Sequence, residues 1–332
     1  MNRITDRISR AAGVTDLVDI LAERLAPTDL QSLLLEVFRR RARKLTAPEV
    51  LRRYDSSRLG QPAPLEPRLL VSFDQLAFAV AAPPFEPVEL SPVAPLGAVS
   101  ALSGLVQNLA VATVRNSEVV SDSTNLMALE CARRRRAHEA RRRDAPPIRL
   151  CASHRLLRGQ AFDDPNLRSH FRLFGLCTAG RDRGAWAFEG EALREQIAVY
   201  LRLFARLHEI GLASAPGRVA VTPVSGGPPA DVVEPSVFAP LRQHFPGTAF
   251  GLDRGRLDGR SYYDGLCFAL YVTTRDGDER ALVDGGFTGW TQLLLADRKE
   301  RLLISGVGSE AVCALLSPER RRTRPGVEGV EG

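Results

Sequence analysis

The segment IRLCASHRLLRGQAFDDPNLRSHFRLFGLCTAG, residues 148–180, carries the clearest structural signal in the chain. One apolar run opens at Leu150 and ends near Arg158, and a second extends from Phe171 to Cys177. Between the runs lie Asp, Pro, Asn and Arg residues, which are typical of turns and loops. The pattern predicts two strands joined by a polar loop, with Arg158 at the end of the first strand. Such a hairpin can hold a guanidinium beside an anion and an aromatic face beside a base.

Four further segments predict a mixture of strands and helices. Residues 73–97 predict the end of a helix, a turn at a Pro-Pro pair and a strand. Residues 119–136 predict a strand, a polar turn and a helix that Asp122 can cap. Residues 259–272 predict a strand beside a tyrosine pair, and residues 284–316 predict a Gly-Gly turn, an amphipathic segment, a strand and a helix. Without strict βαβ alternation, this order favours an α+β fold built on an antiparallel sheet.

In this order the five segments resemble the core of class II aminoacyl-tRNA synthetases. The resemblance is to histidyl-tRNA synthetase and to the regulatory subunit of ATP phosphoribosyltransferase. Residues 73–97 look like motif 1, the helix, strand and proline of the dimer interface, and residues 148–180 look like motif 2. Residues 284–316 look like the closing Gly-Gly strand and motif 3. The resemblance covers roughly residues 70–317, and it implies an antiparallel sheet flanked by helices and a homodimer.

The resemblance also implies a ligand site. Asp122 and Thr124 fall on the positions that hold the amino group of an amino acid, and Arg158 on the position that contacts the ATP α-phosphate. Phe171 matches the ring that stacks on adenine. The candidate ligand-binding residues are Asp122, Thr124, Arg158, Gln160, Tyr262, Tyr263 and Cys177, and the candidate nucleotide-binding residues are Arg158, Phe171 and Glu310. ATP and Mg²⁺ are the implied cofactors.

Several positions depart from the family pattern. Ala311 replaces the motif 3 Arg that contacts the γ-phosphate, and Gln160 replaces the motif 2 Glu that binds the adenine amino group. The second catalytic Arg aligns with Asp258, although Arg256 and Arg260 flank that position and are candidate substitutes. Losing two arginines from a site that must match about four phosphate charges costs several kcal/mol of transition-state stabilisation.

The positions that read the histidine side chain also differ. The glutamate that would bind imidazole aligns with Cys177, and a glutamine aligns with Leu173. Cys and Leu cannot hydrogen-bond imidazole as a carboxylate and an amide do. We therefore expect an amino-acid-like ligand with a small or apolar side chain in preference to histidine.

Three functions follow from these matches and departures. The first is a stand-alone, degenerate synthetase paralogue that binds an amino-acid-like ligand in a regulatory or non-tRNA role. The second is an ATP-dependent ligase that activates an amino acid for a non-tRNA acceptor. The third is a scaffold or regulatory subunit of a metabolic enzyme. The missing arginines favour binding over catalysis, and the sequence leaves open whether the chain is an enzyme.

Bulk composition limits the remaining possibilities. The apolar fraction of 44% and charged fraction of 25% are typical of a soluble globular protein. No apolar run approaches a membrane span, and the N-terminus lacks the apolar core of a secretory signal, so we expect a cytoplasmic protein without membrane contact. Five cysteines and five histidines show no metal-ligand spacing, which predicts buried thiols and no metal site.

Positive charge clusters at residues 39–44, 133–143 and 320–324, almost entirely as arginine. For the middle cluster, Arg133 to Arg143, a contact with nucleic-acid phosphate is one interpretation. A solvated helix end, whose dipole favours cations, is the interpretation we favour. No aromatic residues interleave this cluster, which argues against stacking on single strands.

The chain divides into four segments on composition. Residues 1–60 predict a helical extension that packs as a cap on the core, and residues 61–68 (QPAPLEPR) predict a proline-rich linker. Residues 69–317 form the synthetase-like core. Residues 318–332 are rich in Arg, Gly and Glu and predict a disordered tail, which leaves no space for an anticodon-binding domain.

Overall fold

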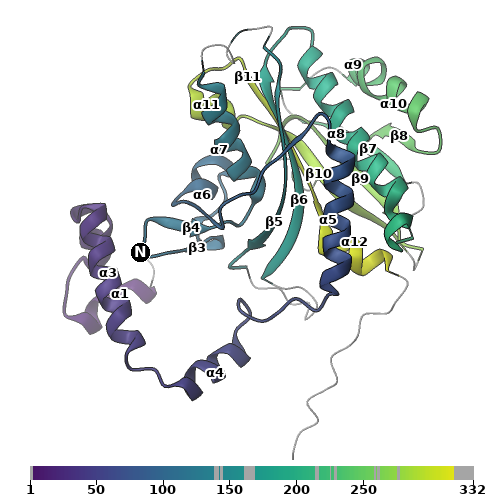
Figure 1. The fold of residues 1–332 in the computed structure, drawn as a ribbon. Helices are drawn as coiled ribbons and strands as arrows, with labels where there is room; N and C mark the ends of the chain where they lie inside the picture. Colours follow the sequence, from purple (N-terminus) through teal and green to yellow (C-terminus); the bar gives the residue numbers. More distant parts are fainter. Residues whose placement is uncertain are drawn as a thin grey trace, which may run out of the picture.

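A sheet of eight strands forms the centre of the molecule (Figure 1). The computed structural model describes residues 3–137, 142, 145–160, 169–213, 217–224, 226–227, 230–257, 259, 262–274 and 277–317. The predicted disordered tail at residues 318–332 lies outside these ranges. The strands of the large sheet are β1 (Glu86–Pro87), β5 (Ile148–Leu157), β6 (His170–Arg181), β7 (Arg218–Pro223), β8 (Ala249–Leu252), β9 (Asp264–Thr273), β10 (Glu279–Thr288) and β11 (Glu300–Gly308).

The strands lie in the order β1-β5-β6-β11-β10-β9-β7-β8. The six inner strands are antiparallel, and only β1 and β8, at the two edges, pair in parallel with their neighbours. The predicted antiparallel sheet of an α+β fold is therefore confirmed. A second, smaller sheet has the order β2-β4-β3 and consists of β2 (Val93–Pro95), β3 (Val111–Ala112) and β4 (Ser117–Val119).

Residues 148–180 form the predicted hairpin, with part of the loop outside the described residues. Strands β5 and β6 pair from Ile148 opposite Ala179 to Leu157 opposite His170. Arg158 follows β5 directly, as the sequence predicts, and residues 161–168 of the polar loop lie outside the described residues. The hairpin therefore places Arg158 at one end of the sheet.

Helices cover both faces of the sheet (Figure 1). One apolar core joins the sheet to α5, α8, α12 and the segment around α10, and the other joins it to α7 and α11. All five cysteines are buried in these two cores, as predicted, and burial raises the pKa of the Cys131 thiol to about 12. The helices of the core are α5 (Pro67–Ala81), α6 (Ala98–Ser103), α7 (Ser123–Arg135), α8 (Ala187–Arg206), α9 (Ala230–Val233), α10 (Ala239–His244), α11 (Trp290–Leu295) and α12 (Ser309–Leu316). Shorter turns of 3-10 or π helix occupy Gln107–Leu109, Leu207–Ile210 and Glu234–Phe238.

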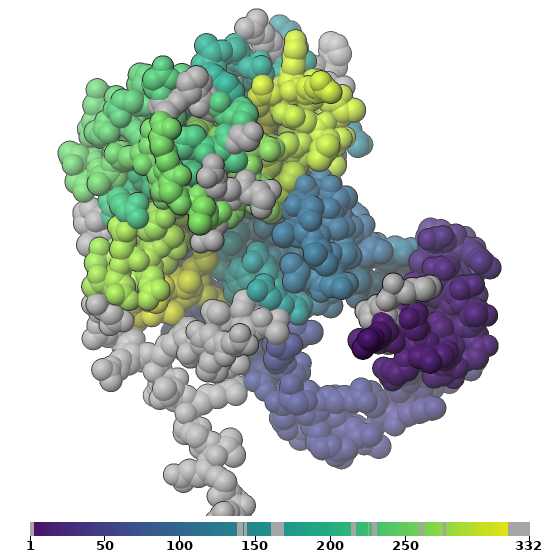
Figure 2. All heavy atoms as spheres, turned by 180° about the vertical axis from the view of Figure 1, so that it is seen from behind, coloured from purple at the N-terminus to yellow at the C-terminus, as the bar shows by residue number. Residues whose placement is uncertain are grey.

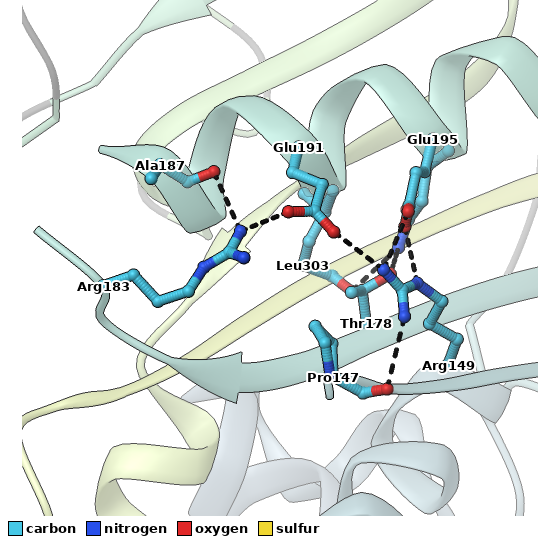
Figure 3. Close-up of polar contacts among 9 residues, drawn as sticks. Pro147, Arg149, Thr178, Arg183, Ala187, Glu191, Glu195 and Leu303 are labelled. Carbon is cyan, nitrogen blue, oxygen red and sulfur yellow. Dashed lines mark hydrogen bonds and ion pairs between the residues drawn. The ribbon is translucent and has the colours of Figure 1, made fainter. Parts of the chain in front are cut away.

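Polar contacts fix helix α8 to the sheet (Figure 3). Arg149 of β5 donates to Glu195 at 2.6 Å and to Glu191 at 2.9 Å. The residue after Glu195, the buried Gln196, donates to the Thr178 hydroxyl of β6 at 2.9 Å. Because these contacts pair the polar groups that packing removes from water, the helix can lie flat on the strands.

The Gly-Gly pair differs from the expectation. Gly285 and Gly286 lie inside β10, not in a turn. A Cβ on Gly286 would lie 2.6 Å from the ring of Tyr263, and a Cβ on Gly285 would lie 2.4 Å from the Cβ of Ser305. The glycines are needed because neighbouring side chains occupy the space beside an extended backbone, and no reversal of the chain occurs there.

The motif 1 segment lies at one edge of the sheet. Helix α5 ends at Ala81, the chain turns at Pro83 and Pro84, and β1 then pairs in parallel with β5. The strand predicted after the Pro-Pro turn is only two residues long, and the chain goes on to β2 in the small sheet. Proline cannot supply ladder hydrogen bonds, which explains why this segment supplies only a short edge strand.

The N-terminal helices stand apart from the core (Figures 1 and 2). They are α1 (Arg3–Ala12), α2 (Leu17–Asp19), a π-helical turn at Ile20–Arg24, α3 (Pro27–Ala42) and α4 (Ala47–Ser56). None contains a buried residue, so the structure differs from the expected cap packed on the core. The exposed apolar side chains include Ile4, Ile8, Val18, Leu33, Phe38, Val50, Leu51 and Tyr54. Amphipathic spacing indicates that a face is apolar, but it does not indicate what covers that face. Across the described residues, no helix has both the length and the apolar content of a membrane span.

The arginine cluster at the end of α7 makes contacts within the protein. Arg133 and Arg134 pair with Glu130, each at 2.7 Å, and hold the pKa of that carboxyl at about 2. Arg135 is fully buried and donates to both carboxylate oxygens of Glu300 at 2.8 and 2.9 Å. The described part of the cluster is therefore largely structural, and residues 138–141, 143 and 144 lie outside the described residues.

We expect Arg135→Ala to destabilise the protein by about 3–5 kcal/mol, because it removes the bidentate partner of the buried Glu300 carboxylate and leaves only the more distant Arg181, at 3.6 Å. Arg133→Ala is the matched control, since Arg133 is exposed and the pairing of an exposed arginine contributes little to stability. Urea unfolding of the two variants measures the difference. The double variant Arg135→Met, Glu300→Leu should recover most of the loss. Equal effects of Arg133→Ala and Arg135→Ala would contradict this assignment.

Candidate functional site

A pocket of about 500 Å³ opens on the α7 side of the sheet. Three separate parts of the chain form its polar wall: the N-terminus of α7, the end of β5 and the residues that precede β9. Six of the seven candidate ligand-binding residues line it, namely Asp122, Thr124, Arg158, Gln160, Tyr262 and Tyr263. Leu173 of β6 and Ile304 of β11 add apolar surface.

Asp122 has two roles, and each of its two carboxylate oxygens has one of them. Oδ1 accepts hydrogen bonds from the Thr124 amide at 2.9 Å and from the Thr124 hydroxyl at 2.7 Å, so Asp122 is the N-cap of α7, as predicted. Oδ2 lies 3.4 Å from the Tyr262 hydroxyl and 3.9 Å from Nη2 of Arg158. The second oxygen therefore adds negative charge to the pocket wall.

Arg158 is held by the backbone around it. Its Nε donates to the carbonyl of Ser121 at 3.0 Å, and the next residue, Gly159, donates its amide to the carbonyl of Leu109 at 2.8 Å. The guanidinium carbon lies 5.0 Å from the centre of the Phe171 ring, a cation–π contact. The side chain remains 36% exposed, which lets it reach an anion in the pocket.

The tyrosine pair forms a rigid part of the wall. The rings of Tyr262 and Tyr263 meet edge to face with centres 5.0 Å apart, and Trp290 packs on Tyr262 at 5.6 Å. Burial, followed by the charges of Asp122 and Asp284 respectively, raises the pKa of both phenols above the usual value. Both hydroxyls therefore stay protonated near neutral pH and donate hydrogen bonds.

Sequence reasoning missed one carboxylate of the pocket, Asp284. Tyr263 donates to its Oδ2 at 2.9 Å, and Nη2 of Arg256 donates to its Oδ1 at 2.6 Å. Side chains two residues apart on a strand share a face, so Asp284 faces the same side as Gly286. Interpreting the Gly-Gly pair as part of a strand, and not as a turn, would have predicted that Asp284 shares a face with Gly286. Of the two candidate substitutes for the missing Arg, Arg256 lies beside the pocket through its pairing with Asp284 but does not line it, whereas Arg260 lies outside the described residues, as does Asp258.

Three candidates lie away from the pocket wall. Cys177 is fully buried, its Sγ lies 3.8 Å from the Thr124 carbonyl, and burial raises the pKa of the thiol. Glu310 of α12 pairs with Arg155 at 2.6 Å, and Phe171 lies under the Arg158 guanidinium. Within the described ranges, no three His, Cys, Asp or Glu side chains gather as metal ligands would.

Comparisons with known proteins find relatives only at the level of structure. No protein-family model matches the chain, and no curated protein matches it. The histidyl-tRNA synthetase of S. aureus superposes with a TM-score of 0.53 at 14% identity, over 76% of this chain and 68% of the other. The chain has a class II aminoacyl-tRNA synthetase-like fold.

Two further solved structures with this class II synthetase-like fold agree. An ATP phosphoribosyltransferase regulatory subunit/histidyl-tRNA synthetase from Bacillus halodurans C superposes with a TM-score of 0.52 at 15% identity, over 78% of this chain and 82% of the other. The histidyl-tRNA synthetase of Nostoc sp. PCC 7120 superposes with a TM-score of 0.50 at 13% identity, over 76% of this chain and 72% of the other. At such identities the likeness shows the fold, and the chemistry must be derived from the residues of this chain.

Proposed function

We propose that this chain is a degenerate class II synthetase paralogue that binds an amino-acid-like ligand in a regulatory or non-tRNA role. The supporting observation is the pocket itself, in which residues from three distant segments converge. The Oδ2 atom of Asp122 provides a partner for an ammonium group. Arg158 provides a partner for a carboxylate. An α-amino acid carries both groups on one carbon, so adjacent charges of opposite sign suit it.

Two features favour binding over catalysis. Ala311 stands where a γ-phosphate cation is needed, and the Phe171 ring that would stack on adenine is already covered by Arg158. A nucleotide would have to displace that guanidinium from the ring, which costs the cation–π contact, about 0.5–1 kcal/mol at a partly exposed site. Weak nucleotide binding is the consequence.

The alternative is an ATP-dependent ligase that uses Mg²⁺ and transfers an activated amino acid to a non-tRNA acceptor. Arg256 favours it, because its guanidinium lies beside the pocket two residues before the position of the missing Arg. That guanidinium is already paired with Asp284, which reduces the charge it can offer to a phosphate. Formation of AMP separates this alternative from simple binding. A ligand-free scaffold is the third candidate, and failure of every amino acid to bind would support it.

We also propose a homodimer formed through the motif 1 region. Strand β1 is an edge strand, and an unpaired edge is a template for another chain. Val93 and Leu96, which follow in the same segment, are large apolar residues that remain exposed. A symmetric contact between two copies would cover both features.

Asp122→Asn separates the ligand role of this residue from its role as a helix cap. Asn caps helices about as well as Asp, so we expect the melting temperature to change little. The charge is lost, so amino-acid affinity should fall about tenfold to a hundredfold. Asp122→Ala, the control, should lose both affinity and about 1 kcal/mol of stability. Thermal shift and calorimetry with the proteinogenic amino acids measure both effects, and unchanged affinity in Asp122→Asn would refute the proposed role.

We expect ATP to bind weakly and through Arg158. Removing this charge-assisted partner in Arg158→Ala should cost about 1.5–3 kcal/mol of binding free energy. Arg155→Ala is the matched control, because Arg155 lies on the same hairpin but pairs with Glu310. Calorimetry gives the affinities, and AMP assayed in the same mixtures with Mg²⁺ and amino acids tests the ligase alternative. Equal ATP affinity in wild type and Arg158→Ala would rule out this nucleotide site.

Light scattering at micromolar concentration should give twice the 36.3 kDa mass of one chain. The double variant Val93→Asp, Leu96→Asp should be monomeric, because two desolvated charges oppose an apolar contact. Leu293→Asp changes an exposed leucine of α11 and should leave the mass unchanged. A monomeric wild type excludes the proposed dimer.

A further inference from the structure

We propose that Asp284 selects a ligand whose side chain carries an N–H or O–H donor. This inference rests on the amino-acid-binding function proposed above and names the class of amino acid. It revises the expectation of a small or apolar side chain, which considered Cys177 and Leu173 alone. Cys177 does not line the pocket, whereas Asp284 does.

Asp284 lies across the sheet from the groups that would bind the α-amino and α-carboxylate groups. Arg158 follows β5, and Asp284 is on β10, with β6 and β11 between them. In register, the row of Asp284 meets β5 at Ala152, and Arg158 is six residues further along the chain. Three strand spacings of about 4.8 Å and six residues of about 3.4 Å therefore separate the two backbones by roughly 25 Å. In register, Asp284 pairs with Gly306, whose bare backbone also lines the pocket. The side chains of Arg158 and Asp284 line the same pocket from these two distant positions, so a ligand held at Asp122 and Arg158 has Asp284 at the opposite end of its pocket.

The tyrosine pair lies between Asp122 and Asp284 and keeps these two carboxylates apart. Tyr262 approaches Asp122 and Tyr263 donates to Asp284, and their rings pack edge to face between these carboxylates. One acid is thus available at the amino end of the pocket and the other at its far end. Two acids at one position would bind a single ammonium, whereas two acids at opposite ends require two donor groups on the ligand.

The Asp284 carboxylate keeps acceptor capacity for a ligand. It accepts one hydrogen bond from Arg256 and one from Tyr263, and a carboxylate has about four acceptor sites. Its side chain is 50% exposed, whereas that of Arg256 is only 11% exposed. Arg256 therefore lies behind the carboxylate and orients it, and the open edge of the carboxylate faces the pocket.

Ligands of matched size test the selection. The pairs asparagine and leucine, glutamine and methionine, and lysine and norleucine differ mainly in the presence of a side-chain donor. Calorimetry with wild type should show about tenfold or greater preference for the donor in at least one pair, since a charge-assisted hydrogen bond contributes that much. Preference within the first two pairs indicates a neutral donor, and preference confined to the third indicates a cation. Equal affinity within every pair overturns the inference.

Substitutions at the acid and behind it complete the test. Asp284→Leu should remove the preference for the donor ligand in the pair that shows one. Asp284→Asn keeps the shape of the side chain and should reduce that preference, and it serves as the test if Asp284→Leu does not fold. Arg256→Ala removes the competing cation and should raise the affinity for lysine several-fold without raising that for norleucine. Asp297→Asn, at a carboxylate paired with Arg181 outside the pocket, is the control and should change nothing.

The two proposals fail in different ways. If wild type binds amino acids and Asp122→Asn weakens all of them, but Asp284→Leu leaves the preference within each pair unchanged, only the selection by Asp284 is wrong. If wild type binds none of the six ligands, the selection by Asp284 is overturned, and if none of the proteinogenic amino acids binds either, the proposed function is overturned with it.

Discussion

The buried pair of Arg135 and Glu300 sets the position of the pocket. Both side chains are excluded from water, and an isolated buried charge is too costly to tolerate, so the end of α7 must lie against the start of β11. Helix α7 extends thirteen residues back from that point, roughly 20 Å at 1.5 Å per residue, to its cap at Asp122. A rigid helix fixed at one end in this way determines where its other end lies. The residue that carries negative charge into the pocket is therefore placed by an ion pair remote from it.

Glycine in the strands supplies the complementary constraint. Beside the pocket, Gly286 admits the Tyr263 ring, and Gly306 admits Leu173, whose Cδ2 would lie 2.9 Å from an added Cβ. The two glycines thus let Tyr263 and Leu173 lie directly against the strand backbone, and both of these side chains line the pocket. Because the Tyr263 ring lies over Gly286, its hydroxyl can donate a hydrogen bond to Asp284. The glycine therefore determines both the packing of the ring and the hydrogen bond to the carboxylate.

Local patterns predict much of this structure, and tertiary pairing accounts for what they miss. The hairpin, the helix cap at Asp122 and the position of Arg158 follow from strand ends, turn residues and cap chemistry within a few residues. Arg135 looks like its neighbours in an arginine run, and only its partner 165 residues away makes it structural. The sequence did not predict Asp284 as a pocket residue, because a Gly-Gly pair is compatible with a turn or with a crowded strand. The exposed faces of the N-terminal helices show the same limit, since periodicity identifies an apolar face without identifying what covers it.

The charges at the pocket are the main argument for the proposed binding function over catalysis. Synthesis of an aminoacyl adenylate must offset about four negative charges on ATP. Among the described residues at or beside this pocket, the cations are Arg158 and Arg256, and each faces a carboxylate, at 3.9 Å and 2.6 Å respectively. Their charge is thus largely matched within the protein, which leaves little for phosphates but provides adjacent donors and acceptors. Such an arrangement suits a ligand that is itself close to neutral overall and carries both signs, as a zwitterion does. The class II fold is present here, while the charges of this pocket suit the zwitterion of the proposed function better than a polyanion.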